Sequence, residues 1–346
     1  MTRVSKVLPV LAIGSLLAAC GSSNRPARSS TPTPAPSVTS NSTVAPTLSP
    51  TPQPASPAPK PSSPAAKPAP RPTSLPPPHN TSPPARPHVL LIMLENKGYG
   101  ATLGSCAADS YLCSLASQYL SATAWYAVGH PSLPNYLAVT SGSTQGCSSD
   151  GCPVGVGAPD LGGQLTAAGI PWEAYMESLP SACDTIAASG VYTRVHNPFV
   201  YYTDNASRCH DVPYPGSGGL ISALDGATPP DFVWISPNLD NDMHDGSVQQ
   251  GDAWLKANLA PVLASSWFTG GTATVIVTMD ENDKQSAPAG GQVPFVVISN
   301  RAKGAGAVTA YGNLFGTLRS IEEVFGLPLL GGAQSLSNGD IVRYFG

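Results

Sequence analysis

Several features are missing from this 346-residue sequence, and each absence narrows what the protein can be. After residue 20, no apolar stretch approaches the roughly 20 residues that a membrane-spanning helix needs. No paired CxxC spacing is present, and no internal repeat is apparent. Residues 88–346 also lack an excess of basic residues, because they carry nine Lys and Arg against 21 Asp and Glu, a net charge of about −12. This argues against non-specific nucleic-acid binding, so an anionic substrate would need a local site, most easily one containing a metal cation.

The first 20 residues are typical of an export signal. Charged residues precede a 13-residue apolar run from Val7 to Ala19, too short to span a membrane comfortably, and small residues precede Cys20. The Leu-Ala-Ala-Cys ending followed by Gly-Ser-Ser resembles a bacterial lipobox. We therefore expect Cys20 to become a lipidated first residue that anchors the protein to the outer face of the cell membrane. A cleaved signal that releases a secreted protein and an uncleaved membrane anchor are the alternatives.

Residues 21–87 form the next compositional segment. They hold 21 of the 38 prolines and six basic residues, with no Asp or Glu. A chain rich in Pro, Ser, Thr and Ala cannot bury a core, so we expect a disordered spacer between the membrane and a catalytic domain of residues 88–346. Binding by the Pro-rich tract, or weak attraction of its basic residues to anionic lipid or wall polymer, are alternatives.

Six cysteines remain in residues 88–346. An even number in an exported domain predicts three disulfides, with zinc ligation as the rival interpretation. Six cysteines allow 15 pairings. The short spacings favour Cys106 with Cys113 and Cys147 with Cys152, which leaves Cys183 with Cys209.

Apolar runs alternate with helix-like segments along residues 88–346. Near-continuous apolar runs are typical of strands buried on both faces of a parallel sheet. Their alternation with helices predicts an α/β fold, a three-layer sandwich with a mostly parallel central sheet, in which ligands bind beyond the carboxyl ends of strands. The expected strands are 88–94, 230–236, 272–279 and 293–299, and the expected helices are 109–119, 133–140, 160–168, 249–268 and 313–325.

Polar clusters follow three of these strands. Carboxylate and amide oxygens are ligands of divalent cations, and adjacent carboxylates in a cleft repel each other strongly without one. One cluster alone could be a cap or an acidic surface loop, but three at strand ends predict a site for a divalent cation of unknown identity. The clusters are Glu95-Asn96, Asp240-Asn241-Asp242-Met243-His244-Asp245 and Asp280-Glu281.

The segment 130–136 places Ser132 at an expected helix start, with Pro134 in the first turn. A serine there is commonly a simple N-cap. A helix start also offers N–H groups and a positive dipole end to phosphate oxygens. The hydroxyl needs a base or a metal to become a nucleophile, and His130 is the adjacent basic group. Together with the acidic clusters, Ser132 predicts a metal-assisted ester hydrolysis site.

Taken in order, these motifs resemble one family. It is the bacterial phosphoesterase family of acid phosphatases and phospholipases C, within the alkaline-phosphatase superfamily. Inside it, secreted acid phosphatases with phosphatidylinositol-3-phosphatase activity are the most similar. The resemblance runs from about His88 to Pro328. It rests on Glu95-Asn96-Lys97-Gly98-Tyr99, on His-Pro-Ser-Leu-Pro-Asn-Tyr at 130–136, on Asp-Asn-Asp-Met-His-Asp-Gly at 240–246 and on Asp280-Glu281, with further similar stretches at 192–198 and 250–255.

The resemblance implies roles for the residues around the phosphate. Ser132 stands where related phosphodiesterases place a threonine, so it would be the nucleophile. Asn135 would contact a phosphate oxygen, and His244 would protonate the leaving alkoxide. His130 and His196 would line the phosphate pocket.

The resemblance also implies a metal site, which two departures narrow. Relatives commonly carry a His-Tyr pair where this chain has Leu314-Phe315, and often x-Asp-Gly where Lys284 follows Asp283. The missing histidine weakens a two-metal arrangement, so one metal is expected. Its ligands would be Glu95, Asn96, Asp280 and Glu281, and a second site would involve Asp240 and Asp242.

The sequence thus predicts a monomeric, metal-dependent hydrolase of phosphate monoesters that acts on a small molecule or a phospholipid headgroup. Attack by Ser132 would give a phosphoseryl enzyme that water then hydrolyses. A phospholipase C-type phosphodiesterase is the alternative within enzymes, although the sequence shows no pocket for a second substituent. A surface-binding lipoprotein without catalysis is the alternative from another class, and Leu314 and Lys284 favour it.

Overall fold

The structure is a computed structural model that describes residues 86–205, 209–302 and 306–345. The expected signal peptide of residues 1–20, with Cys20, lies outside the described residues. So does the expected linker of residues 21–87, apart from its last two residues.

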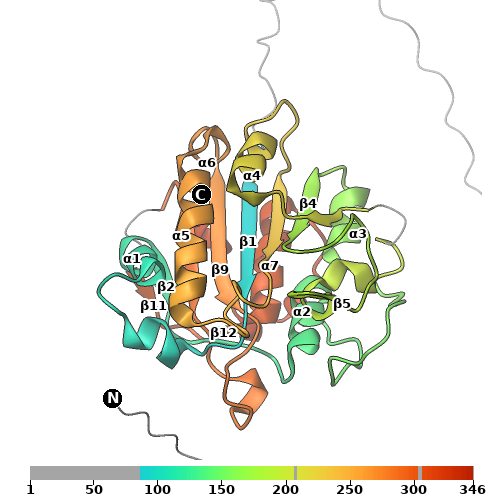
Figure 1. Ribbon diagram of the computed structural model, residues 1–346, viewed down its shortest axis with the longest axis horizontal. Coiled ribbons are helices and arrows are strands. Elements are labelled where there is room, and N and C mark those ends of the chain that lie inside the picture. The colour runs from blue at the N-terminus through green and yellow to red at the C-terminus, as the bar shows by residue number, and fades with distance from the viewer. Residues whose placement is uncertain (1–85, 206–208, 303–305, 346) are drawn as a thin grey trace, which may run out of the picture. The chain divides into compact units, whose positions relative to one another are not determined.

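Buried apolar strands form the centre of an eight-stranded sheet (Figure 1). β1 (His88–Leu94) pairs in parallel with β8 (Phe232–Ser236) on one side and with β9 (Ala273–Met279) on the other. All three lie within the expected strand segments, and every residue of β8 and β9 is buried. The strand order is β11-β2-β10-β9-β1-β8-β4-β7, where β2 is Leu120–Ala122, β4 is Trp172–Met176, β7 is Asp211–Pro213 and β11 is Gly306–Val308.

β10 (Phe295–Ser299) is the exception to the parallel arrangement. It runs antiparallel to both β9 and β2. Parallel neighbours need a crossover of a dozen or more residues, usually a helix, and only a loop and a short 3-10 turn (Pro288–Gly290) separate β9 from β10. The sheet is therefore mostly parallel, as the sequence predicted.

Helices cover both faces of the sheet. In Figure 1, α5 lies in front of the sheet and α7 behind it. α1, α4 and α6 contact α5, whereas α2 contacts both α3 and α7, so the three-layer arrangement is confirmed. The helices are α1 (Tyr111–Gln118), α2 (Ser132–Ser141), α3 (Leu161–Ala167), α4 (Gly216–Leu224), α5 (Val248–Ala264), α6 (Ser266–Thr269) and α7 (Leu314–Phe325).

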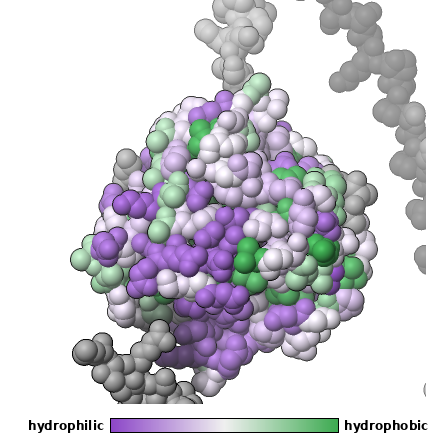
Figure 2. Space-filling view, viewed as in Figure 1, coloured by the Kyte–Doolittle hydropathy of each residue, from purple (hydrophilic) through white to green (hydrophobic). Residues whose placement is uncertain are grey.

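The expected helix of residues 249–268 is two helices. The backbone of Ser265 is extended, with φ −69° and ψ 159°, and its side chain accepts a hydrogen bond from the Phe268 N–H. Serine favours this N-cap conformation over a helix interior, so it ends α5 and starts α6. The outward surface of α5 is polar, with Gln249, Gln250 and Lys256 exposed. Figure 2 shows a hydrophilic area on the face that α5 covers.

Eight short strands and one helix, α4, were not predicted from the sequence. α4 begins with Gly-Ser-Gly-Gly, a composition that disfavours helix, and the burial of Leu220 and Leu224 stabilises it instead. Two small sheets complete the structure: β12 (Gly312–Asn313) pairs with β3 (Trp125–Tyr126), and β5 (Ala188–Ser189) pairs with β6 (Tyr192–Thr193).

Three disulfides link Cys106 to Cys113, Cys147 to Cys152 and Cys183 to Cys209. The expected pairing is thus confirmed, and it indicates folding in an oxidising compartment. Within the described ranges, none of the helices has the length and apolar character to cross a membrane.

Candidate active site

The loops that follow β1, β8 and β9 meet at one edge of the sheet and are tied together through the backbone. The Glu95 N–H donates to the Asp242 carbonyl oxygen (2.8 Å), and the Asp280 N–H donates to the Leu94 carbonyl oxygen (3.1 Å). The Asn96 N–H donates to the Asp280 carboxylate (3.1 Å) from a left-handed backbone, φ 53°, that Asn tolerates better than most residues. The strand ends therefore bring these predicted residues together.

Ser132 is the first residue of α2, and its hydroxyl faces this group. Its Oγ donates a hydrogen bond to Glu95 Oε2 over 3.0 Å. Both side chains are buried, with 4% of Ser132 and none of Glu95 exposed. The helix-start hydroxyl and the carboxylate at the end of β1 thus share one site.

The start of α2 offers a phosphate fewer N–H groups than the sequence suggested. Pro131 and Pro134 have no N–H, and the Leu133 N–H donates to Asp150 Oδ1 over 2.9 Å. Of the four N–H groups that a helix start normally leaves unpaired, at most that of Ser132 remains. The start of α2 therefore contributes little through its N–H groups, and other groups must neutralise a bound anion.

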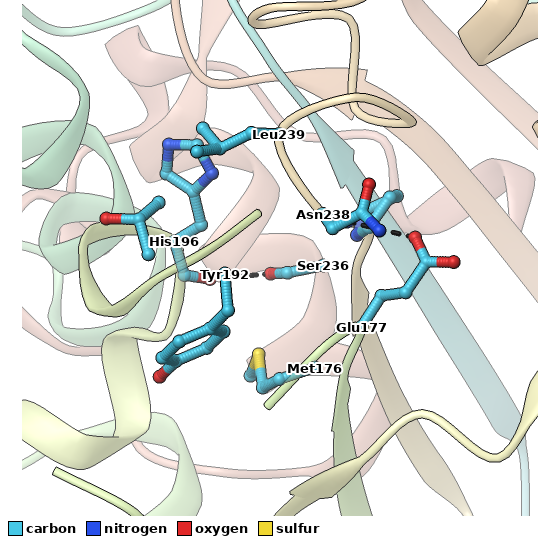
Figure 3. A pocket seen from close by; sticks show the side chains of 9 residues that line it. Met176, Glu177, Tyr192, His196, Ser236, Asn238 and Leu239 are labelled. Atoms are coloured by element: carbon cyan, nitrogen blue, oxygen red, sulfur yellow. Dashed lines mark hydrogen bonds between the residues drawn. The ribbon is translucent and has the colours of Figure 1, made fainter. Parts of the chain in front are cut away.

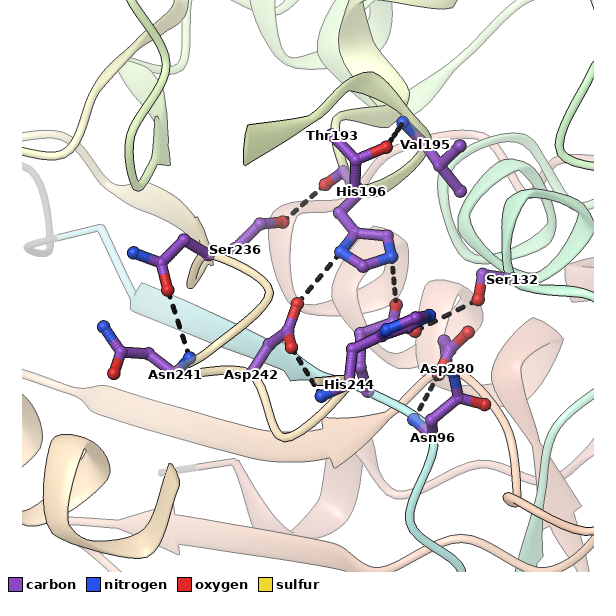
Figure 4. A network of polar contacts seen from close by, with 12 residues as sticks. Asn96, Ser132, Thr193, Val195, His196, Ser236, Asn241, Asp242, His244 and Asp280 are labelled. Carbon is purple, nitrogen blue, oxygen red and sulfur yellow. Dashed lines mark hydrogen bonds and ion pairs between the residues drawn. The ribbon is translucent and has the colours of Figure 1, made fainter. Parts of the chain in front are cut away.

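His196 lies between two buried carboxylates (Figure 4). Its Nε2 is 3.3 Å from Glu95 Oε1, and its Nδ1 is 3.0 Å from Asp242 Oδ2. The ring stacks on Tyr136 with centroids 5.4 Å apart and an interplanar angle of 8°. The Ser236 hydroxyl donates to the His196 carbonyl oxygen (2.6 Å), which fixes the backbone as well.

The loop after β8 divides between the site and the surface. Asp242 is fully buried and accepts the His244 N–H at 2.7 Å, whereas Asp240 is exposed. Of the two residues expected at a second metal site, Asp242 therefore lies in the buried cluster and Asp240 faces solvent. His244 itself stays close, with its ring centroid 5.8 Å from that of His196, and its Nδ1 lies 2.8 Å from Asp245 Oδ1. About a third of the His244 side chain is exposed, so it occupies the solvent side of the site.

His130 and Glu281 form a second histidine–carboxylate pair. His130 Nδ1 hydrogen-bonds Glu281 Oε2, and 2% of the Glu281 side chain is exposed. His130 Nε2 is buried without a hydrogen-bond partner among the described residues. This leaves one ring nitrogen of His130 for a ligand.

Asn135 serves the loop before α2. Its Oδ1 accepts the N–H groups of Val128 (2.9 Å) and Gly129 (3.1 Å). Its Nδ2 donates to the carbonyl oxygens of Gly129 (2.9 Å) and Pro131 (3.1 Å). These four bonds use the whole hydrogen-bonding capacity of the amide. The expected contact of Asn135 with phosphate is thus wrong, and this residue shapes the loop that carries His130 and Ser132.

Crowded carboxyl groups perturb one another in this site. Burial raises the pKa of Glu95 well above its usual range, and Asp280 and Asp242 raise it further. Burial also raises the pKa of Asp280. The pKa of Glu281 rises to about 9, mainly through burial and then through Asp280 and Asp150. Burial and mutual repulsion therefore favour the protonated forms of these carboxyl groups, and a bound cation would favour the ionised forms.

The donor set fits a divalent cation. Glu95 Oε1, Asp242 Oδ2 and Asp280 Oδ2 are buried and lack hydrogen bonds within the described residues, although the first two face His196 as ion-pair partners. Buried carboxylate oxygens normally find a donor or a cation. Among the described residues, no three acidic, His or Cys side chains stand in a ready-made ligand cluster, so a cation would have to draw these side chains together.

Two residues of the site were missed by the sequence analysis. Tyr136 lies one helical turn after Ser132, and burial followed by Glu95 raises the pKa of its hydroxyl well above the usual range. The spacing of four residues from Ser132 could have indicated this, because residues i and i+4 share one face of a helix. Asp150 lies in the loop between Cys147 and Cys152, and nothing in the sequence indicated that this loop reaches the Leu133 N–H at the start of α2.

A small cavity behind His196 has a volume of about 10 Å³ (Figure 3). It is close to the volume that one water molecule needs, so it is no substrate pocket. Its wall includes Glu177, whose carboxylate accepts the Asn238 N–H (3.0 Å), the Asn241 side-chain amide (3.1 and 3.0 Å) and the Trp254 indole N–H (3.1 Å). Glu177 thereby fixes the loop that presents Asp242 and His244.

Known proteins share both the sequence pattern and the fold. The model of the phosphoesterase family matches residues 107–328. A phosphatidylinositol-3-phosphatase of Mycobacterium tuberculosis is 33% identical over 262 residues, which cover 73% of this chain and 81% of that protein. An acid phosphatase of Aspergillus fumigatus is 30% identical over 260 residues, covering 69% of this chain and 55% of the fungal protein. The crystal structure of a Vibrio parahaemolyticus protein in the alkaline phosphatase superfamily shares the fold, with a TM-score of 0.53 at 12% identity. The match covers 72% of this chain and 69% of that protein.

Proposed function

Because this chain belongs to the phosphoesterase family of hydrolases that act on phosphoric esters, we propose that it is a metal-dependent phosphatase with Ser132 as its nucleophile. The observation that carries this proposal is the 3.0 Å hydrogen bond from Ser132 Oγ to Glu95, at the edge where three strand ends meet. The names of the relatives favour phosphate monoesters, including a phosphorylated lipid headgroup, as substrates.

Glu95, Asn96, Asp280 and Glu281 are the residues that would hold the cation. Their oxygens suit a hard or borderline divalent ion, and the proposal is supported by the buried oxygens of Glu95 and Asp280 that accept no hydrogen bond within the described residues. When bound, the cation would neutralise phosphate charge and lower the pKa of the serine hydroxyl. Asp242 contacts the same histidine as Glu95, because His196 Nδ1 lies 3.0 Å from Asp242 Oδ2.

The chain's own residues then divide the reaction between them. Ser132 Oγ transfers its proton toward Glu95 Oε2 and forms a bond to phosphorus, while the bond from phosphorus to the alkoxy oxygen breaks. His244 stands on the solvent side, where it gives the departing oxygen a proton, so an alcohol leaves. Water hydrolyses the phosphoserine, releases inorganic phosphate and restores Ser132. His130 Nε2, which has no other partner within the described residues, would contact a phosphoryl oxygen during both steps. Both ring nitrogens of His196 face carboxylates, so His196 would position Glu95 and Asp242 instead.

The test replaces the nucleophile alone. Ser132→Ala should lower kcat on p-nitrophenyl phosphate by about a thousandfold or more, because losing one member of a catalytic unit removes most of the rate enhancement. Chelator should lower wild-type activity similarly. Ser222→Ala is the matched control, since Ser222 lies on the exposed surface of α4 and its hydroxyl bonds only a local carbonyl oxygen. Undiminished turnover by Ser132→Ala, or no phosphoserine in quenched wild-type enzyme by mass spectrometry, contradicts the mechanism.

The proposal extends to where the enzyme works. Lipidation of Cys20 after export would tether the domain to the outer face of the membrane through residues 21–87. The three disulfides support an exported protein. Cys20→Ala should move the enzyme from the membrane fraction to the medium or to another soluble fraction, and retention in the membrane fraction would contradict the anchor.

A further inference from the structure

A disulfide loop carries a carboxylate to the start of α2. Asp150 lies between Cys147 and Cys152, which are bonded to each other. Cys147 is buried and packs in one apolar cluster with Leu133 and Leu137 of α2, so the loop is fixed to the helix that begins with Ser132. Asp150 Oδ1 accepts the Leu133 N–H at 2.9 Å.

This contact places negative charge where an anionic substrate must approach. A helix start normally attracts anions through unpaired N–H groups. Here Asp150 takes one of those groups, two prolines remove others, and Ser132 is the adjacent residue. The charge of Asp150 also contributes to the raised pKa of Glu281, the residue that hydrogen-bonds His130.

Building on the proposed function, we infer that Asp150 is a specificity-determining residue that limits the charge of the phosphoryl group the site accepts. A singly charged group, such as a monoester that keeps one proton or a diester, meets less repulsion than a dianion. The carboxylate is not part of the bond-making machinery. It acts through its charge on the substrate, at a distance set by the Cys147–Cys152 loop.

The buried polar atoms of the site support an anion pocket beside Asp150. Asp280 Oδ2 and His130 Nε2 are buried and unpartnered within the described ranges, and Ser132 Oγ stands among them. A bound cation with one phosphoryl group would satisfy them. At the helix start, one more negative charge on that group would meet the Asp150 carboxylate and, of the helix N–H groups, at most that of Ser132.

The experiment compares a dianionic with a monoanionic substrate. At about pH 8 p-nitrophenyl phosphate carries two negative charges, because the second pKa of a phosphate monoester is about 6. Bis(p-nitrophenyl) phosphate carries one. Asp150→Asn keeps an oxygen for the Leu133 N–H but removes the charge. It should raise the ratio of kcat/KM for the monoester to kcat/KM for the diester about tenfold, the scale of one unit charge acting across several ångströms near a protein surface. Inhibition by inorganic phosphate should tighten in parallel.

A matched control exists at the opposite edge of the sheet. Asp225 Oδ1 accepts the N–H of Trp267, the second residue of α6, at 3.1 Å, just as Asp150 accepts that of Leu133 in α2. Asp225→Asn should leave the ratio unchanged, and Asp150→Glu, which keeps the charge, should leave it near the wild-type value.

Each outcome decides something. An unchanged ratio in Asp150→Asn, or an equal loss on both substrates with a lower Tm, overturns the inference and assigns Asp150 a helix cap role, while wild-type hydrolysis of the monoester still upholds the proposed function. If wild-type enzyme with added divalent cation hydrolyses neither substrate, the proposed function fails and the inference fails with it.

Discussion

The two ends of β1 and β8 carry acidic residues in opposite electrostatic settings. At the end where these strands begin, Asp231 lies 3.4 Å from the Arg86 guanidinium and 3.5 Å from the His88 ring. At the end where they finish, Glu95 and Asp242 are buried deeper, and each has an oxygen without a hydrogen bond within the described residues. One carboxylate therefore has two basic neighbours at the first edge, whereas two carboxylates share one histidine at the second.

This difference separates a structural from a functional use of carboxylates. An ion pair at the edge of the fold needs no ligand. Buried carboxyl groups with raised pKa values are unfavourable for folding, and they persist where a ligand relieves them. His196 alone lies between Glu95 and Asp242, so one histidine faces two carboxylates. The comparison therefore predicts that changes at the two edges have opposite consequences for activity and stability.

The largest effect should come from Glu95→Gln at the uncompensated edge. We expect kcat/KM for p-nitrophenyl phosphate to fall by at least about 100-fold, because the variant loses a metal ligand and the acceptor for the Ser132 proton. The Tm without metal should stay equal or rise, since an unfavourable buried carboxyl group is removed. A variant with wild-type activity and a lower Tm would make Glu95 an ordinary structural residue and erase the contrast.

Adding a divalent cation should raise the Tm of the protein by binding at the edge that contains Glu95. A divalent cation at about 100 times its Kd should stabilise the folded protein by about 2.7 kcal/mol and raise Tm by roughly 5–10 °C. Differential scanning fluorimetry with Mg²⁺, Ca²⁺, Mn²⁺ and Zn²⁺ in turn tests this. Glu95→Gln should lose most of the shift, whereas Asp231→Asn should keep it. Equal shifts in both variants would place the cation elsewhere.

The sequence predicted the features that depend on local patterns, and it did not predict those that depend on contacts between distant loops. Burial of β1, β8 and β9 and the acidic residues after them followed from apolar runs and their ends, so the meeting of Glu95 with Asp280 was predictable. Long-range contacts within loops were not. Asp240 and Asp242 look alike in sequence, yet the turn between them buries one and exposes the other. Asn135 and Asp150 found backbone partners that no periodicity reports, and the antiparallel direction of β10 depends on the connection rather than on its own residues.

A smaller effect is expected from Asp231→Asn at the compensated edge. Losing the contacts with Arg86 and His88 should lower stability by about 0.5–1 kcal/mol and Tm by roughly 2–4 °C, as for other partly exposed ion pairs. Activity should stay at the wild-type level because the whole length of β1 separates the two edges. A drop in kcat/KM with an unchanged Tm would show that the edges are coupled.

The smallest effect concerns Glu322 on α7, a buried carboxyl group away from both edges, and it tests whether a raised pKa alone marks a functional residue. Burial raises the pKa of Glu322 to about 8, and its two oxygens accept the Leu330 N–H at 3.1 and 3.3 Å. Between about pH 4.5 and 8 the folded state binds more protons than the unfolded state, so this group makes stability fall as the pH rises. Glu322→Gln keeps an acceptor for Leu330 and removes the titration, so its Tm should decline less than that of wild type across this window, with unchanged activity. Parallel Tm profiles for the two proteins would show that Glu322 titrates at its ordinary pKa. Loss of activity in Glu322→Gln would show that satisfied hydrogen bonds do not distinguish structural from functional carboxyl groups.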